Sequence, residues 1–187
     1  MTIEELYNCF CSNFKKDSTL TRKSNNTEWT KNIYSYFYKH GIENSFQVYA
    51  KPNIIKEAKQ EYLVDLCWSK EEARDYFDYR GLELILESEW LTSEDELMWD
   101  FCKLIDMKAF LKVMIICIDK KGVEDIIKKM AGTIKSSRIK FQEENYLVII
   151  FVPMPSIYNP DKYIIEGYKI NYEGIHQRLK PTEFSLD

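Results

Sequence analysis

The chain has 187 residues, of which 45% are hydrophobic and 30% charged, and its formal net charge at pH 7 is -4. This balance excludes disordered and fibrous classes, and an acidic chain is unlike a protein whose whole surface grips nucleic acid. We expect one domain over residues 1–187, and a cytoplasmic, membrane-free protein, since there is neither a secretory signal nor a run of about eighteen apolar residues.

The five cysteines are an odd count. Cys67, Cys102 and Cys117 lie inside apolar patterns, which predicts reduced thiols in the core. Cys9 and Cys11 form a C-x-C pair with no second pair at zinc-site spacing, so we expect no zinc centre.

The N-terminal part predicts two helices and a strand. Apolar residues recur every four positions over 3–16, which is typical of one helix face. A second helix is expected to begin at Thr27 as its N-cap and to stop at Gly41. Alternating residues 46–50 predict a strand, which Pro52 ends.

Residues 61–68 have the length and composition of a strand. Alternation places Asp65 on one face with Glu61, Leu63 and Cys67, and the aromatic and aliphatic residues between them on the other. The interpretation makes Asp65 a carboxylate in the middle of a strand.

Residues 82–90 predict the next strand, Leu-Glu-Leu-Ile-Leu-Glu-Ser-Glu-Trp. Glu87 and Glu89 share one face with Ile85, near the C-terminal end of the strand. Two glutamates therefore point in the same direction.

The rest of the chain alternates helices and strands. Ser93 with Glu96 predicts a capping box that starts a helix running to about Lys108. A continuous apolar run over 110–118 predicts a buried strand, so a parallel crossover should join it to the preceding strand. Further elements are expected at 123–136 (helix), 146–152 (strand) and 163–172 (edge strand or hairpin).

The chemistry is expected where the acidic strands pair. In an antiparallel pair, carboxylates from one face of each strand converge, and a divalent cation compensates the cost of burying them. Oxygen ligands suit Mg²⁺, which commonly uses only one or two protein carboxylates. We expect Asp65 and Glu87 to bind Mg²⁺ or Mn²⁺, with Glu89 beside them, in a site for phosphodiester hydrolysis.

The helix-strand-strand-strand-helix-strand order with these acids resembles the PD-(D/E)XK, or restriction-endonuclease-like, nuclease superfamily over about residues 28–118. On that resemblance Asp65 matches the first acid and Glu87 the second, and Glu89 stands where the motif usually has lysine, a variant form found in some restriction enzymes. The Glu-Ser-Glu-Trp stretch, with Asp-Phe-Cys-Lys-Leu at 100–104, is also similar to small uncharacterised bacterial proteins assigned to the superfamily.

The resemblance implies an α/β fold with an αβββαβ core, a mixed central sheet and flanking helices, followed by a helix and strands over 121–175. It implies a Mg²⁺-dependent endonuclease acting on DNA in bacterial defence or nucleic-acid processing, and a homodimer as an option. Lys103 on the following helix is a candidate for the positive charge that the motif lysine usually supplies. A helical wheel, however, sets Lys103 opposite the apolar stripe, towards solvent.

The sequence leaves two alternative roles open for several other residues. Glu61 is a candidate outer ligand or a solvated strand start. Lys112 and the pairs Lys120-Lys121 and Lys128-Lys129 either contact phosphates or form a solvated face. Trp90 and Trp99 are base-stacking candidates or core aromatics, and neither His40 nor His176 is given a role.

Two other function classes also remain. The missing motif lysine and the acidic charge leave a catalytically inactive nuclease-fold protein that acts as a binding or regulatory module. A small-molecule enzyme is a weaker alternative, because the sequence has no glycine-rich phosphate loop and no nucleophile elbow.

Overall fold

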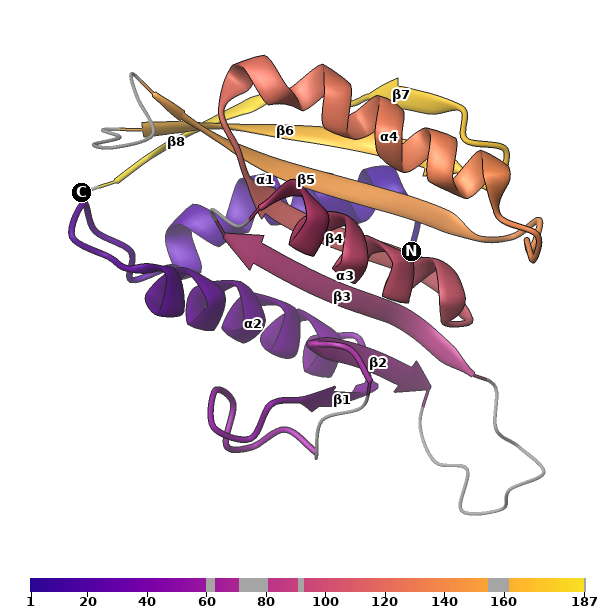
Figure 1. Cartoon of the computed structure of the whole chain (residues 1–187). Helices are drawn as coiled ribbons and strands as arrows, with labels where there is room; N and C mark the ends of the chain where they lie inside the picture. Colours follow the sequence, from indigo (N-terminus) through magenta and orange to yellow (C-terminus); the bar gives the residue numbers. More distant parts are fainter. Residues whose placement is uncertain (60–62, 71–80, 91–92, 155–161, 187) are drawn as a thin grey trace.

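The computed structural model describes residues 1–59, 63–70, 81–90, 93–154 and 162–186. Helices and strands follow one another in the order α1 (Ile3–Asp17), α2 (Asn26–Glu43), β1 (Phe46–Ala50), β2 (Leu66–Lys70), β3 (Leu82–Trp90), α3 (Glu94–Asp106), β4 (Ala109–Cys117), the short 3-10 turn η2 (Lys120–Gly122), α4 (Val123–Ser136), β5 (Asn145–Met154), β6 (Lys162–Asn171), β7 (His176–Arg178) and β8 (Thr182–Ser185). Figure 1 shows this α/β arrangement.

The strands form one mixed sheet in the order β1-β2-β3-β4-β5-β6-β7, with β8 also paired to β6. β1, β2 and β3 are antiparallel neighbours, whereas β3, β4 and β5 are parallel. The expected parallel crossover from β3 through α3 to β4 is therefore confirmed. β4 and β5 occupy the middle of the sheet, where their apolar runs are covered on both faces.

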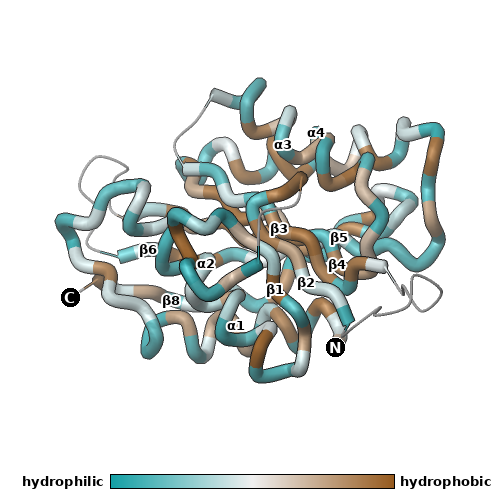
Figure 2. The backbone as a smooth tube through the Cα atoms, turned by 90° about the horizontal axis from the view of Figure 1, so that it is seen from below, coloured by the Kyte–Doolittle hydropathy of each residue, from teal (hydrophilic) through white to brown (hydrophobic). Residues whose placement is uncertain are grey.

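Helices cover both faces of the sheet, and each face has its own hydrophobic core. α1 and α2 pack on one face over residues that include Leu84, Leu86 and Trp90. α3 and α4 pack on the other face over Ile85 and the alternate residues of β4 and β5. Figure 2 shows the hydrophobic strands between these two helical layers. Glu87 and Glu89, in phase with Ile85, therefore point to the α3 side.

The helix predictions are largely confirmed, but two boundaries in α2 were wrong. Its N-cap is Asn25, not Thr27, and Asn25 exchanges hydrogen bonds with Glu28 in a capping box. Glu28 stands three residues after Asn25, at the spacing such a box requires. Gly41 does not stop the helix; a Cβ there would lie 2.7 Å from the indole nitrogen of Trp68, so the glycine permits close packing instead.

The strand predictions are right for β1, β3, β4, β5 and β6, and the one for β2 was wrong at its start. β2 begins only at Leu66, so Asp65 immediately precedes the strand and is not in its middle. For β6 the hairpin is the alternative that the structure confirms, because β6 pairs antiparallel with β5, and β7 and β8 pair along its other side.

All five cysteines are free thiols, which confirms the prediction of reduced thiols for Cys67, Cys102 and Cys117. Cys67 and Cys117 are buried, whereas Cys102 is only partly buried on α3, so its placement in the core was wrong. Among the described residues no helix is both long and apolar enough to cross a membrane.

Candidate functional site

Two partners hold Asp65 just before β2: a lysine that follows β1 and a backbone amide of β3. Its Oδ1 lies 2.9 Å from Nζ of Lys51, which directly follows β1. Its Oδ2 accepts a hydrogen bond of 3.0 Å from the backbone N–H of Ser88 on β3. A side chain that bonds the neighbouring strand and faces a lysine is fixed in one orientation, so Asp65 is not a freely solvated surface acid.

The β2–β3 pairing brings Asp65 beside Glu87. Leu66 pairs with Leu86 in this antiparallel ladder, and continuing the register by one residue places Asp65 opposite Glu87. Residues opposite each other project to the same face. The structure thus brings together Asp65 and Glu87, the two residues that the sequence predicted as metal ligands.

α3 closes the site from above the sheet with Asp100 and Lys103. Nζ of Lys103 lies 3.1 Å from Oε1 of Glu87 and also forms an ion pair with Asp100. Of the two alternatives left open for Lys103, the helical wheel favoured solvent, but the structure turns the side chain towards Glu87. Its long side chain is half-buried and reaches from the helix to β3, which a wheel of α3 alone does not reveal.

Burial and like charge make the two glutamates weak acids. Burial first, and then the charge of Asp65, raises the pKa of Glu87 to about 8, although Lys103 acts in the opposite direction. Burial and a hydrogen bond with Asp100 raise the pKa of Glu89 to about 7. Near neutral pH both groups can therefore hold or release a proton.

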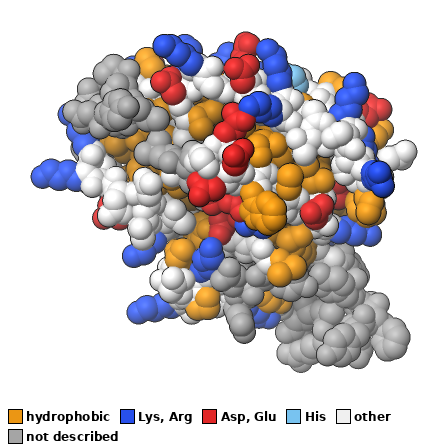
Figure 3. All heavy atoms as spheres, viewed as in Figure 1, with side chains coloured by type: hydrophobic (Ala, Val, Ile, Leu, Met, Phe, Trp, Pro, Cys, Tyr) orange, Lys and Arg blue, Asp and Glu red, His pale blue; other side chains and the backbone are white. Residues whose placement is uncertain are grey.

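The pKa of Lys103 is also raised, which for a lysine favours the charged form. Burial disfavours its charged form, but its interactions with Asp100 and Glu87 outweigh burial and raise its pKa. The lysine accordingly stays positively charged beside two carboxylates. Figure 3 shows acidic side chains gathered near the middle of the face that also carries α3.

Three further residues of the site, Lys51, Asp100 and Tyr34, were not predicted from the sequence. Tyr34, on α2, is buried, and burial together with the Asp65 carboxylate raises its pKa. Asp100 carried a usable signal, because it stands three residues before Lys103 and one helical turn brings both to one side. Lys51 and Tyr34 carried none, since only the tertiary fold places them next to Asp65.

The donor set fits a divalent cation with few protein ligands. Glu87 is 1% exposed, and its Oε1 lies 3.1 Å from the ammonium of Lys103. A buried carboxylate beside a second carboxylate supplies the oxygen ligands that suit a hard cation such as Mg²⁺. Within the described part of the chain, no group of three or more His, Cys, Asp or Glu side chains is arranged for a metal.

The other candidates fall outside this cluster. Glu61 lies outside the described residues. Lys112 is fully buried and cannot contact a phosphate, whereas Lys120, Lys121, Lys128 and Lys129 are exposed, and the last two pair with Glu124 and Glu94.

The tryptophans and histidines singled out in the sequence differ in burial. Trp90 is a core residue packed on Trp29, but Trp99 is exposed on α3 next to Asp100. His40 stacks on Tyr36 within α2, and His176 lies exposed in β7. Neither histidine belongs to the acidic cluster.

Comparison with known proteins adds no relationship to this geometry. No family model matches the chain, and no curated protein matches it significantly.

Proposed function

We propose that the chain is a divalent-metal-dependent nuclease that hydrolyses phosphodiester bonds of DNA, in bacterial defence or nucleic-acid processing. The observation that carries the proposal is the convergence of Asp65 and Glu87 under Lys103, with Glu87 buried and its pKa raised to about 8. A site that keeps carboxylates close together at the cost of raised pKa values is a functional-site candidate.

The order of elements supports the same proposal. Helix α2, the antiparallel strands β1, β2 and β3, helix α3 and the parallel strand β4 follow in the αβββαβ order that the resemblance to PD-(D/E)XK nucleases implies. Asp65 directly precedes the second of these strands and Glu87 lies in the third, close to the positions of the two motif acids. Fold order alone does not specify chemistry, so the proposal depends on the side chains.

Asp65 and Glu87 would hold the cation. When bound, Mg²⁺ or Mn²⁺ makes water more acidic and offsets the negative charge that develops on the phosphate. The backbone N–H of Ser88 and the ammonium of Lys51 fix the orientation of Asp65, so the first ligand is positioned before any ion arrives.

Glu89 is suited to accept a proton. A general base works best when its pKa lies near the working pH, and the pKa of Glu89 is raised to about 7 by burial and Asp100. We assign Glu89 as the base that receives the proton of the attacking water.

Lys103 supplies the positive charge that the motif position at Glu89 lacks. Its ammonium already lies beside Glu87, on the side of the site formed by α3. In this position it stabilises negative charge on a bound phosphate, and its raised pKa keeps it charged throughout the neutral range.

A plasmid assay tests the proposal. Purified protein with Mg²⁺ or Mn²⁺ should nick or linearise supercoiled plasmid, and Asp65→Ala or Glu87→Ala should reduce the rate by at least about 100-fold. Glu83→Gln, at the other end of β3, is the matched control and should cleave like wild type. Absence of cleavage across both metals and across DNA and RNA would reject the nuclease function.

A catalytically inactive binding or regulatory module is the second candidate. It is favoured by the two lysines, Lys51 and Lys103, which already pair with Asp65 and Glu87. Such compensation stabilises the acids without a cation. This alternative predicts no cleavage and no heat of Mg²⁺ or Mn²⁺ binding in calorimetry. The nuclease proposal predicts cleavage and a measurable heat of metal binding.

A further inference from the structure

A cavity of about 670 Å³ lies near the start of β3, away from the acidic cluster. The volume is within the range of small-molecule pockets, roughly 300–1,000 Å³. Its walls come from the beginning of β3, the α3–β4 junction and the segment before β5: Gly81, Leu82, Lys108, Ala109, Phe110, Lys140, Phe141, Gln142, Glu143 and Glu144.

Two aromatic side chains line this cavity and remain open to solvent. Phe110 is 46% exposed and Phe141 is 40% exposed, although side chains of this type usually lie in a core. They come from distant parts of the sequence, so the fold itself gathers them. Aromatic faces that border a hollow favour a flat, unsaturated ring as the ligand.

Two lysines at the cavity suit an anion attached to that ring. Nζ of Lys108 lies 5.1 Å from the ring centroid of Phe141. Lys140 is exposed and precedes Phe141, and its ammonium, which donates a hydrogen bond to the carbonyl of Lys135, would turn from that carbonyl to a phosphate. The carboxylate of Glu144 is paired with Lys112 at 2.8 Å, and Gln142 and Glu143 are acceptors that suit the amino groups of a nucleobase rather than a phosphate.

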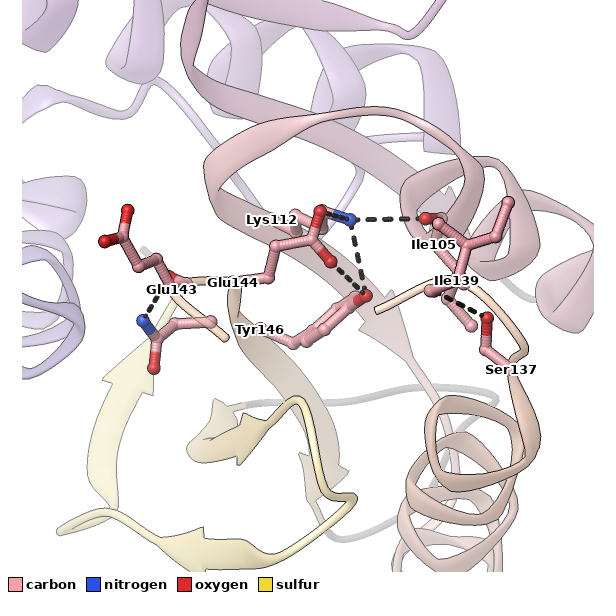
Figure 4. Close-up of polar contacts among 8 residues, drawn as sticks. Ile105, Lys112, Ser137, Ile139, Glu143, Glu144 and Tyr146 are labelled. Atoms are coloured by element: carbon pink, nitrogen blue, oxygen red, sulfur yellow. Dashed lines mark hydrogen bonds and ion pairs between the residues drawn. The ribbon is translucent and has the colours of Figure 1, made fainter. Parts of the chain in front are cut away.

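A buried polar network beside the cavity joins β4, the end of α3 and the start of β5, as Figure 4 shows. Lys112 on β4 is 0% exposed and contacts Glu144, the carbonyl of Ile105 at the end of α3, and the hydroxyl of Tyr146 on β5. Buried ion pairs seldom stabilise a fold more than apolar residues would. Their geometric effect here is to fix the cavity walls in place.

We infer that this cavity binds a nucleotide, with the base stacked on Phe110 or Phe141 and the phosphate held by Lys108 and Lys140. The ligand is either a free nucleotide or an unpaired nucleotide of a single strand, which present the same base and phosphate. Leu82 is five residues before Glu87 on β3, roughly 17 Å at strand spacing. The site is therefore separate from the acidic cluster, and the inference does not require nuclease activity.

Calorimetric titration of metal-free protein tests the inference, with deoxyadenosine monophosphate and a short oligo(dA) as separate ligands. Lys108→Ala combined with Lys140→Ala should weaken binding at least tenfold, and so should Phe141→Ala alone. Lys120→Ala combined with Lys121→Ala is the matched control, which removes two exposed lysines elsewhere and should change nothing. Circular dichroism checks that each variant is folded.

The outcomes separate the two sources. Saturable, variant-sensitive binding of the mononucleotide supports a free nucleotide, and variant-sensitive binding of the oligonucleotide alone supports a strand. Binding of neither, equal binding of inorganic phosphate, or binding that the cavity variants leave unchanged would overturn the inference. Asp65→Ala should abolish cleavage and leave cavity binding intact, so failure of the nuclease proposal is distinguishable from failure of this one.

Discussion

Lys103 reaches across from α3 to place its ammonium nitrogen 3.1 Å from Oε1 of Glu87 on β3. The contact joins a helix and a strand that are separated in the sequence by the β3–α3 connection, and it lies on the face of the sheet that carries Glu89. A permanent cation beside a buried carboxylate can assist a reaction, and it also competes with a metal ion for the same oxygen.

Lys103→Met should therefore separate metal binding from turnover. Removing the ammonium leaves Glu87 free for the metal, so Mn²⁺ affinity should rise, while cleavage should fall by about 100-fold because the charge near the phosphate is lost. Calorimetry and plasmid cleavage measure the two quantities. Lys103→Arg is the matched variant and should keep part of the activity; weaker Mn²⁺ binding in Lys103→Met would contradict the competition.

Glu87 should make the metal-free protein less stable at high pH. Its pKa in the folded chain is raised to about 8 from an ordinary 4.5, so folding favours the protonated form. The contribution of Glu87 to the free energy of unfolding is fully present below its ordinary pKa of 4.5, and it is lost as the pH rises through about 8.

Chemical denaturation in EDTA at several pH values measures this effect. Wild type should lose stability relative to Glu87→Gln between about pH 5 and 9, because the amide cannot ionise. Glu83→Gln, on the same strand, should follow the wild-type curve. Parallel curves for wild type and Glu87→Gln would show that burial of Glu87 carries no such cost.

Trp99 should report on DNA bound at the acidic cluster. It is 73% exposed and adjoins Asp100, whereas Trp29, Trp68 and Trp90 are buried. Acrylamide should quench mainly Trp99 fluorescence, and an oligonucleotide added in EDTA should protect it. Trp99→Ala should weaken oligonucleotide affinity roughly tenfold, the scale of one stacked base.

The controls for Trp99 are internal. Trp99→Phe should remove the quenchable signal and retain most of the affinity, since a ring for stacking remains. If acrylamide quenching of wild type is the same with and without oligonucleotide, DNA does not bind over this part of α3.

Gly41→Ala should destabilise the fold. The added methyl group would lie 2.7 Å both from the Trp68 indole nitrogen and from a Val48 methyl carbon, and overpacking of this kind costs about 1–3 kcal/mol. The free energy of unfolding from urea denaturation measures the loss. Gly132→Ala on α4, where a Cβ meets nothing within 4 Å, is the matched control and should be neutral or stabilising.

The alternating strands made the acidic cluster predictable. Glu87 and Glu89 share a face because side chains in a strand alternate, and the antiparallel pairing of β2 with β3 then brings in Asp65. The same local logic failed for Lys103, whose long side chain crosses to β3. It also failed at the start of α2, where Asn25 and Thr27 are both capping residue types and the position of Glu28 selects Asn25.

Other parts of the site depend on packing between distant segments. Lys51 directly follows β1, and the pairing of β1 with β2 places it beside Asp65. Lys112 reads in the sequence as a possible phosphate contact, but β4 lies in the middle of the sheet and buries it against Glu144. Neither partner could be assigned from local pattern, since each pair is made by tertiary structure.

Mn²⁺ titration followed by electron paramagnetic resonance is the sharpest test of metal binding by Asp65 and Glu87. It should be done above the pKa of Glu87, about 8, where protons no longer compete with the metal. We expect one tightly bound ion per wild-type chain, at least tenfold weaker binding by Asp65→Ala and by Glu87→Ala, and unchanged binding by Glu83→Gln. Equal Mn²⁺ affinity in all four proteins, or no bound ion in wild type, would contradict it.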